Sequence, residues 1–414
     1  MQLALVGALA LAWRVTYVLH WKGSDGELSD EGDAFYYSAQ AVANAHGDLF
    51  LHPYVGGAAA DHPPITALLV TPVSWIDDPL RLVVAQRLVM AVIGTLTVVV
   101  VGLLGRRLAG PRAGILAALL ASAYAALWMN DGLVMAEAPA ALCAALLLLG
   151  ALAIRDDPSA ARLAVYGILA GVATLTRAEL ALLLPALAGP ALWSARSVAA
   201  PPRWRAAGAA LLTFALVLAP WVGWNLSRFE EPTLLSTNDG LTLLGANCPT
   251  TYYTPAIGFW SLQCAFDHPV EGDQSEVSAA WRDVGIRYAR DNLGRLPKVA
   301  VARVGRVWGL YEPRQMVFFN DGEGREVWAS WTGMYQSWAL YPLAAAGAVV
   351  LRRRRRPVLP LLTTIGTVTF TALAFYGIVR FRVPADVAFV ALGGVALDAL
   401  WRRVRPDRES ARAA

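Results

Sequence analysis

Residues 82–104 read LVVAQRLVMAVIGTLTVVVVGLL, a stretch in which Arg87 is the one charged residue. A helix of this length crosses the roughly 30 Å hydrocarbon core of a bilayer at about 1.5 Å per residue. Similar runs recur along the 414 residues, 57% of which are hydrophobic and 16% charged, with a mean hydropathy of +0.46. These values exclude an ordinary soluble domain and predict an all-α integral membrane protein.

We expect a bundle of about ten spans, near residues 1–20, 82–104, 113–129, 133–154, 163–176, 178–193, 206–224, 331–351, 358–376 and 385–401. The fifth and sixth are short and meet at Thr174-Leu175-Thr176-Arg177, so their boundaries are the least defined. The first span lacks a basic start and a small-residue cleavage site before Trp21, which favours a retained helix over a signal peptide.

Basic residues are distributed unequally between the two sets of alternating short loops. With the N-terminus inside, the inner segments hold 18 lysine and arginine residues and the short outer segments hold five. The positive-inside rule therefore predicts a multi-pass protein of the cytoplasmic membrane with both termini cytoplasmic. The formal net charge of +4 follows from this loop anchoring, and nothing in the chain predicts a nucleic-acid partner.

The spans divide the chain into three parts. Residues 1–224 form a transmembrane module whose first outer loop, 21–81, is rich in carboxylates. Residues 225–330 form an extracytoplasmic loop region of about 100 residues, and 331–414 hold the last helices and a basic cytoplasmic tail. Within the long loop, Val277 to Trp308 has helical apolar spacing. Its basic residues either meet lipid phosphates or form a solvated face. These residues are Arg282, Arg287, Arg290, Arg295, Lys298, Arg303 and Arg306.

Three cysteines occur, and two share the long outer loop. Cys248 and Cys264 lie sixteen positions apart in an oxidising location, so we expect a disulfide between them. Two buried thiols or a metal pair are the alternatives. Cys143 falls inside the fourth span and is expected to be a small core residue.

The first outer loop contains residues 29–37, SDEGDAFYY, with three carboxylates in four positions. A carboxylate at a helix start just outside the bilayer, such as Asp33, can act as a general base, because the membrane edge and neighbouring acids can raise its pKa toward neutrality. The alternative is that Asp30 or Asp33 simply caps the helix that runs to Ala45. One helical face follows Asp33 and is suited to holding a sugar; it comprises Tyr36, Tyr37, Gln40 and Asn44.

Two further elements carry charge beside the membrane. Asp61-His62-Pro63-Pro64 places an acid and an imidazole on a rigid corner before a helix from Ile65, either as an active-site wall or as a polar turn. Glu137 and Arg177 lie toward the outer ends of apolar spans, where an unpaired charge is costly. They either pair with neighbouring helices or take part in acceptor activation or metal binding.

The last short outer segment, residues 376–384, reads YGIVRFRVP. Arg380 and Arg382 flank an aromatic residue there and break the positive-inside trend. Two guanidinium groups at a bilayer surface suit a lipid phosphate or diphosphate. Interfacial snorkelling is the alternative.

These motifs, in this order, resemble C-type (GT-C) glycosyltransferases of the protein-mannosyltransferase kind. The closest resemblance is to actinobacterial members of the broad group that includes lipid A aminoarabinose and galacturonic acid transferases. The matching elements are Gly32 to Tyr37, His62-Pro63-Pro64, Gly110 to Gly114, Met135-Ala136-Glu137, Leu175 to Glu179, Pro220-Trp221 ahead of Asn225, and Tyr376 to Pro384.

The resemblance implies transfer of a sugar, with inversion, from a polyprenyl-phosphate donor to an envelope lipid, glycan or protein at the outer face. Asp33 would be the general base, with Asp61 and Glu137 as further catalytic acids. The donor phosphate would meet a basic set that comprises Arg380, Arg382, Arg177 and His62. Asp33, Asp61, His62 and Glu137 form a mixed oxygen and nitrogen set that suits several divalent metals, so metal dependence stays open.

Two other classes of membrane protein are alternatives to a glycosyltransferase. A transporter or flippase of lipid-linked saccharides would show two half-chains of matching hydropathy, and no such repeat is present. A membrane acyltransferase would place a histidine within a span, whereas all five histidines lie at boundaries or in outer loops.

Overall fold

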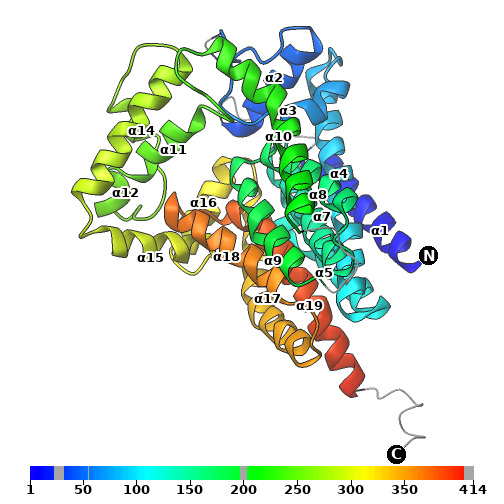
Figure 1. Ribbon diagram of the computed structural model, residues 1–414. Helices are drawn as coiled ribbons and strands as arrows, with labels where there is room; N and C mark the ends of the chain where they lie inside the picture. Colours follow the sequence, from blue (N-terminus) through cyan, green and yellow to red (C-terminus); the bar gives the residue numbers. More distant parts are fainter. Residues whose placement is uncertain (23–31, 55, 196–202, 405–414) are drawn as a thin grey trace, which may run out of the picture.

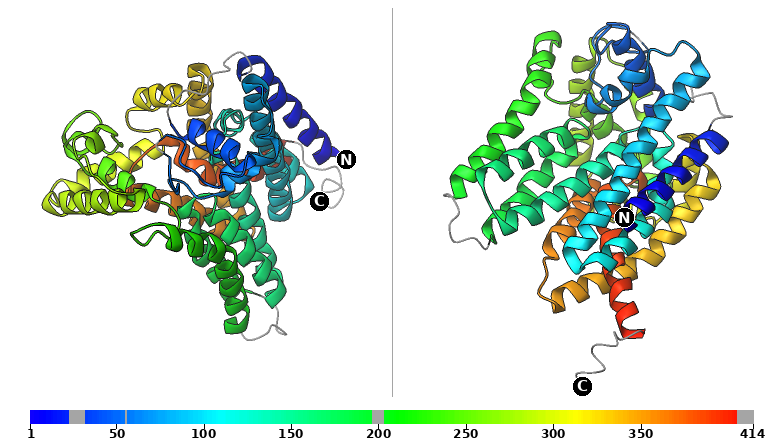
Figure 2. Two further views of the ribbon diagram at one scale, coloured as in Figure 1. Left: turned by 90° about the horizontal axis from the view of Figure 1, so that it is seen from above. Right: turned by 90° about the vertical axis from the view of Figure 1, so that its right-hand side faces the viewer.

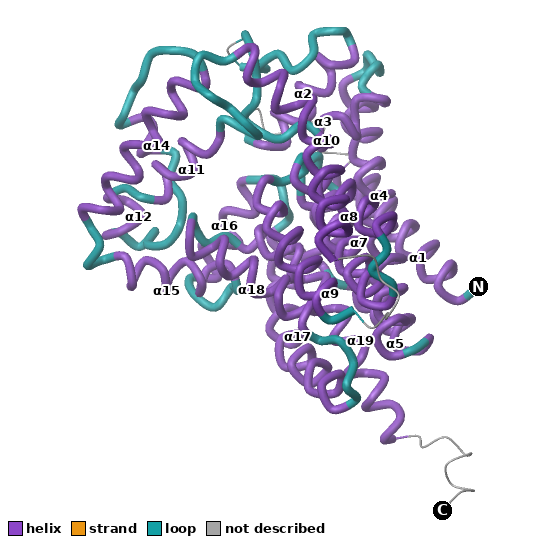
Figure 3. Tube along the Cα trace, in the orientation of Figure 1, coloured by secondary structure: helices purple, strands orange, loops and turns teal. Residues whose placement is uncertain are grey.

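The computed structural model describes residues 1–22, 32–54, 56–195 and 203–404. Over these residues the chain is helical, and its one β contact is an isolated bridge between Leu51 and Ala58 (Figure 3). The all-α architecture predicted from the sequence is confirmed.

The apolar elements form a bundle and fall where the ten spans were expected. They are α1 (Gln2–Tyr17, extended by a π-helical turn Val18–Lys22), α4 (Pro79–Ala109), α5 (Pro111–Ala123), α6 (Ala125–Asp131), α7 (Glu137–Asp156), α8 (Ala160–Thr174), η3 (Ala178–Leu182), η4 (Leu184–Ala188), α9 (Gly189–Trp193), α10 (Arg203–Arg228), α17 (Val327–Arg353), α18 (Leu359–Ala374), η5 (Val379–Arg382) and α19 (Val383–Val404).

Length and composition alone qualify five of these helices, over the described residues, to cross a membrane, or six if the bent pair α5 and α6 is one span. That pair bends by 59° at Tyr124, whose extended backbone interrupts the helix. Shorter apolar segments cover Ala160–Thr174, Ala178–Trp193 and Leu359–Ala374. The fold is that of a multi-pass membrane protein.

Helix α19 runs through the middle of the bundle and contacts α17, α5, α4, α7 and α18 (Figure 2). Close approach depends on small residues. A Cβ on Gly394 would lie 2.6 Å from the backbone of Ala117 in α5, and one on Gly347 would lie 2.0 Å from the Leu392 carbonyl. These contacts hold α19 and its preceding turn, η5, in a fixed place relative to the rest of the bundle.

The remaining helices gather at one end of the bundle, and we call residues 32–78 and 229–326 the head (Figure 1). Its helices are α2 (Asp33–Ala45), α3 (Ile65–Val70), η2 (Thr71–Val73), α11 (Asn238–Ala246), α12 (Pro249–Tyr253), α13 (Gln263–Phe266), α14 (Gln274–Asp291), α15 (Leu296–Val307) and α16 (Pro313–Gly322). Cys248 and Cys264 are joined by a disulfide with their Cα atoms 6.4 Å apart, which is the pairing expected from the sequence.

The helical stretch expected over Val277 to Trp308 is two helices rather than one. Helix α14 ends at Asp291 and α15 begins at Leu296, separated by a turn that contains Gly294. Arg303 and Arg306 point into the head. Arg303 donates to the Ala246 carbonyl at 2.8 Å and Arg306 to the Ile257 carbonyl at 2.7 Å. Neither is available for lipid phosphates.

A buried ion pair locks α1 to α6. Arg14 Nε donates to Asp131 Oδ2 at 2.6 Å, and both side chains are buried. The pair needs room on α4, because a Cβ added at Gly94 would stand 2.0 Å from Asp131 Oδ2. The absence of a side chain at position 94 therefore allows the pair to form.

We expect Gly94→Ala to destabilise the protein by about 1–3 kcal/mol, because the added methyl overpacks the site of Asp131. Gly366→Ala in α18 is the matched control, since no described atom lies within 4 Å of its added Cβ. That change should be neutral or stabilising by up to about 1 kcal/mol. Thermal unfolding in detergent measures both, and equal midpoints for the two variants would contradict the packing argument.

Candidate active site

The site is built around Asp33, the first residue of α2. The helix starts there because Gly32 adopts a φ of 104°, which favours glycine, and so Gly32 rather than Asp33 takes the N-cap position. The Asp33 side chain accepts a hydrogen bond from Arg380 Nη1 at 2.8 Å. It lies 3.4 Å from His62 Nε2 and stays 30% exposed. A substrate can therefore reach this carboxylate.

Arg380 lies in the middle of a cluster of acids. It comes from η5, the turn that leads into the central helix α19. Its Nη1 lies 2.8 Å from Asp33 and also 2.9 Å from Glu323 Oε1, and its Nε lies 3.8 Å from Glu137 Oε1. Segments from four distant parts of the chain thus meet at one guanidinium group.

Each of these three acids also has a second basic partner. Asp33 has His62. Glu137 Oε1 accepts from Arg177 Nη1 at 2.9 Å, and Glu323 Oε2 accepts from Arg325 Nη1. Arg380 is the partner they share, so its removal would leave none of the three without a basic neighbour.

Two polar atoms in the cluster remain unpaired. Arg380 Nε and Glu137 Oε2 are buried and have no hydrogen-bond partner among the described residues. An unsatisfied buried polar atom costs about 1–3 kcal/mol, and more when it belongs to a charged group. In a native structure such atoms call for a specific explanation, and a bound substrate is one.

The electrostatics of Asp33 differ from the sequence-based expectation. Burial would raise its pKa, but Arg380 and His62 outweigh burial and hold the pKa of this carboxyl well below its ordinary value. The rise toward neutrality considered from the sequence is not found in the free protein, because Arg380 and His62 contact Asp33 itself. Glu323 behaves in the opposite way, since burial raises its pKa despite Arg380 and Arg325.

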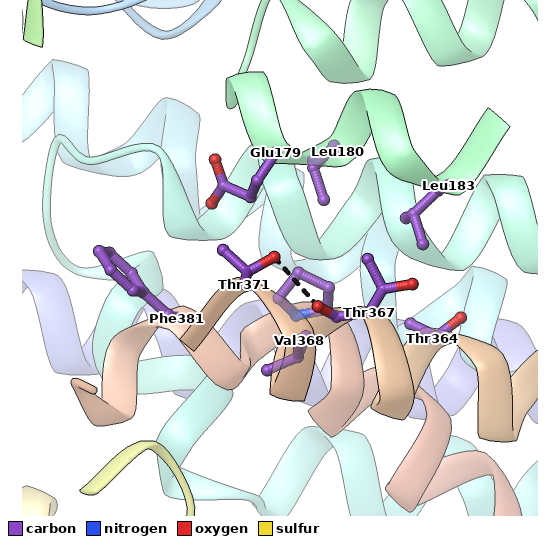
Figure 4. Close-up of a pocket in the computed structure, with 9 residues that line it drawn as sticks. Glu179, Leu180, Leu183, Thr364, Thr367, Val368, Thr371 and Phe381 are labelled. Atoms are coloured by element: carbon purple, nitrogen blue, oxygen red, sulfur yellow. Dashed lines mark hydrogen bonds between the residues drawn. The ribbon is translucent and has the colours of Figure 1, made fainter. Parts of the chain in front are cut away.

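A narrow groove adjoins the cluster between η3 and α18 (Figure 4). Apolar groups and threonines line it: Leu180, Leu183, Thr364, Thr367, Val368, Thr371 and Pro384. Glu179 and Phe381 stand at one end of it. Glu179 accepts from Arg177 Nε at 2.6 Å, and the Phe381 ring lies 4.6 Å from the Arg177 guanidinium carbon. The groove therefore ends beside the arginines of the cluster.

Arg382, expected beside Arg380 as a second phosphate ligand, points elsewhere. It is 2% exposed, and its Nε donates to Asp386 Oδ2 at 3.3 Å. Its other nitrogens donate to Ser337, Tyr341 and the Tyr124 hydroxyl. Residues two positions apart in a tight turn can face different neighbours, and here Arg382 connects the start of α19 to α17 and to Tyr124 between α5 and α6.

Asp61 lies in a separate pair with His52, whose Nε2 is 2.9 Å away. Gln274 Nε2 donates to Asp61 Oδ2 at 3.1 Å, and the Thr237 hydroxyl is 3.4 Å from Oδ1. Asp61 thus connects the first loop to the start of α14, while its neighbour His62 turns toward Asp33.

The face of α2 expected to hold a sugar is buried. Tyr36, Tyr37 and Gln40 are at most 3% exposed. The His62 ring lies 4.8 Å from that of Tyr37 and 5.1 Å from that of Tyr36, centroid to centroid. These aromatic residues orient the imidazole from beneath the site and do not present a surface to a ligand.

Glu323 and Arg325 were not singled out from the sequence. They belong to residues 321–326, DGEGRE, directly before the apolar run of α17. Arg325 is fully buried and its Nε donates to Asn130 Oδ1 at 2.8 Å. The signal that could have identified them is a group of charged residues, separated by two glycines, directly beside an apolar span. Asp30 and Glu31, the other acids of the first loop, lie outside the described residues.

The donor set does not fit a metal ion. Across the parts of the chain that the structure describes, no three histidine, cysteine or acidic side chains come together as ligands. The acids of the cluster face arginines, and a divalent cation would have to displace those arginines to bind. We therefore derive no step through a metal.

Residues 61–224 match the family model described as dolichyl-phosphate-mannose-protein mannosyltransferase. This range includes Asp61, His62, Glu137 and Arg177, but neither Asp33 nor Arg380. A search of the curated proteins finds no match.

Solved structures match along nearly the whole chain. The apo oligosaccharyltransferase of Archaeoglobus fulgidus aligns over 99% of this chain at 14% identity, with a TM-score of 0.57. The oligosaccharyltransferase AglB of the same organism, in complex with an inhibitory peptide and a dolichol-phosphate, aligns over 100% at 14% identity and a TM-score of 0.52. This chain spans 52% of the length of each.

ArnT from Cupriavidus metallidurans aligns over 88% of this chain and 72% of its own at 16% identity, but a TM-score of 0.39 supports no conclusion. The two oligosaccharyltransferase structures do establish the architecture. The chain therefore has the fold of the C-type glycosyltransferases, and its residues 61–224 match the mannosyltransferase family model.

Proposed function

We propose that this protein is a glycosyltransferase that moves a sugar from a polyprenyl-phosphate donor to a hydroxyl group of an envelope lipid, glycan or protein. The observation that carries the proposal is the position of Arg380, which three carboxylates share while each keeps a basic partner of its own. Such an arginine can turn to a phosphate without leaving a buried acid unpaired.

In this proposal, donor binding exchanges the carboxylate partners of Arg380 for the donor phosphate. The unpaired Nε of Arg380 offers a donor hydrogen to a phosphate oxygen from the start. As the phosphate approaches, the guanidinium pairs with it in the two-pronged geometry that arginine favours. Asp33 then remains with His62, and Glu323 with Arg325. Arg177, 2.9 Å from Glu137, holds that second acid in place.

In this proposal the first isoprene units of the donor follow the groove between η3 and α18, which has to widen to admit them because its accessible volume is about 10 Å³. Leu180 and Leu183 line one wall, threonines of α18 line the other, and the groove ends at Phe381 beside the arginines (Figure 4). A phosphate at Arg380 followed by a hydrocarbon chain in this groove matches the order of groups in a polyprenyl phosphate. The dolichol-phosphate bound to AglB supports the same ligand class here.

The transfer follows from these positions. The acceptor hydroxyl attacks the anomeric carbon, its proton passes to the Asp33 carboxylate, and a new carbon–oxygen bond forms with inversion. The bond to the phosphate oxygen breaks, and the leaving polyprenyl phosphate keeps the electron pair, which Arg380 stabilises. Glu137 Oε2, unpaired in the free protein, is placed to accept a hydrogen bond from a sugar hydroxyl.

Donor binding also makes Asp33 a stronger base. In the free protein burial raises the pKa of Asp33, but Arg380 and His62 overcome this effect. When Arg380 turns to the phosphate, the lowering contribution falls and burial remains. The base gains proton affinity only when the donor is present, which protects the donor-free site from non-productive protonation.

The pH dependence tests this coupling. A depressed pKa keeps Asp33 ionised in the free protein, so the acid limb of kcat/KM should lie below the ordinary value of 3.8. The acid limb of kcat, which reports the donor complex, should lie at higher pH. Rate measurements at limiting and saturating donor separate the two. Coincident limbs would contradict the coupling.

The function itself is tested by mass spectrometry of cell-envelope glycolipids and glycans with and without the gene, paired with binding of a polyprenyl monophosphate to the purified protein. We expect one glycosylated species to disappear and the phosphate lipid to bind. An unchanged envelope together with no lipid binding would reject the proposal. The positive-inside pattern supports an extracytoplasmic site, which labelling of residues 352–356 from either side of the membrane tests.

A further inference from the structure

Helix α15 packs one face against the head and the end of α18, and its opposite face is apolar, with Pro297 and Val301 exposed and Val304 half-exposed. Its packed face consists of Val299, Ala302, Arg303, Arg306 and Val307. Pro297, Val301 and Val304 follow one another at steps of four and three residues, so they form a single stripe on the opposite side. Val301 is 73% exposed. A helix on a soluble surface would be expected to place polar groups along this stripe.

Exposed apolar residues also stand just before and just after α15. Leu293 precedes the helix and is 63% exposed, and Leu310 follows it and is 67% exposed. Lys298, also exposed, is the one charged side chain next to the stripe within the helix. The exposed surface is therefore a band of aliphatic groups with a single flanking cation.

The position of α15 in the molecule indicates which environment contacts these exposed aliphatic residues. The helix lies along the edge of the head nearest the bundle and runs crosswise to α17 and α19 (Figure 1). It contacts α18, and Arg303 Nη1 donates to the Leu373 carbonyl at the end of that helix at 3.1 Å. On α18 itself Phe370 and Leu373 are exposed apolar residues of a membrane helix.

We infer that the exposed stripe of α15, formed by Pro297, Val301 and Val304 with Leu293 and Leu310 just beyond the helix, lies in the interfacial layer of the bilayer. Because α15 lies against the end of α18, where Phe370 and Leu373 are exposed, lipid that covers this end of α18 also reaches the exposed face of α15. The aliphatic groups enter the boundary between headgroups and acyl chains, and Lys298 extends to the lipid phosphates.

Through this contact the membrane would help to fix the position of the head relative to the bundle. Buried arginines of α15 already connect it to several head segments, since Arg303 bonds Asn247 and Arg306 bonds Gln315. A helix held from one side by lipid and from the other by these bonds sets the height of the head above the bundle. The inference depends on burial and packing and does not depend on the sugar transferred.

Spin labelling in lipid nanodiscs tests the inference. In a Cys143→Ser background, which leaves Cys248 and Cys264 oxidised, single labels are placed by Val301→Cys on α15 and by Arg287→Cys on α14. Phe370→Cys on α18 is the reference for lipid exposure. All three native side chains are exposed, so the fold tolerates the labels. Relaxation is measured with oxygen, which concentrates in lipid, and with a water-soluble nickel chelate.

We expect the label at 301 to resemble that at 370, with oxygen collisions exceeding nickel collisions several-fold, and the label at 287 to show the reverse. Strong nickel relaxation at 301 would mean that the stripe is solvated and would overturn the inference. Weak relaxation by both reagents at 301 would mean that protein covers the stripe, and this result would overturn it equally.

Discussion

Replacing Asp33 by asparagine should lower turnover by about 10²-fold or more while the protein stays folded. The substitution keeps the size of the side chain and its hydrogen bond from Arg380, but an amide cannot take the acceptor proton. General-base catalysis typically contributes 10²–10⁴-fold, and the variant loses that contribution. Transfer from a purified lipid-linked donor, measured at saturating donor, gives the turnover. Binding of the donor lipid should change much less than turnover.

The matched control for this change is Asp61→Asn. Asp61 comes from the same loop and has the same chemistry, but it bonds His52 and Gln274 instead of Arg380. We expect this variant to loosen the junction between the first loop and α14 and to lower thermal stability, with a small loss of turnover. Full activity in Asp33→Asn, or equal losses in both variants, would exclude Asp33 as the base.

Much of the architecture was predictable because the membrane imposes it. The backbone polar groups of residues 82–104 can be satisfied in hydrocarbon only as a helix, and the same argument predicts a helix for each long apolar run of the chain. A helix running to Ala45 was predictable for a local reason, since the acidic run marks a helix N-terminus, although its N-cap is Gly32 and not one of the acids. Local signals of this kind do not depend on distant parts of the chain.

The site was predictable only in part, because its residues meet through long-range packing. Asp33, Glu137, Arg177 and Arg380 were candidates from their charge and position, and the structure brings them together. Their pairing was not predictable. The direct contact of Arg380 with Asp33 at 2.8 Å depends on how closely α19 packs into the bundle, which no local pattern of residues specifies.

Arg382 is a second residue whose contacts could not be predicted from the sequence. In sequence it is equivalent to Arg380, two positions away in a short basic turn. In the structure the irregular turn η5 points one guanidinium into the acid cluster and the other toward Asp386. A pattern of residue types cannot distinguish these outcomes, because the direction of each side chain is set by the surrounding helices.

The second large effect is expected for Arg380→Ala, which should weaken donor binding and turnover together. Without Arg380 no guanidinium neutralises the charge that develops on the leaving phosphate, and loss of one such donor typically costs about 10²–10³-fold in kcat. The same group binds the phosphate in the ground state, so the apparent donor requirement should rise as well. Arg380→Lys should recover part of the binding, since it restores a charge without the two-pronged geometry.

Arg382→Lys is the control that separates the two arginines. Arg382 faces Asp386, so the conservative change should affect stability and leave the donor requirement near that of the unaltered protein. In Arg380→Ala, Asp33 loses the cation that holds its pKa down, and the acid limb of the remaining activity should move to higher pH even at limiting donor. That shift is the sign that phosphate and Asp33 compete for one guanidinium. An Arg380→Ala protein with unchanged donor affinity would show that the phosphate binds elsewhere.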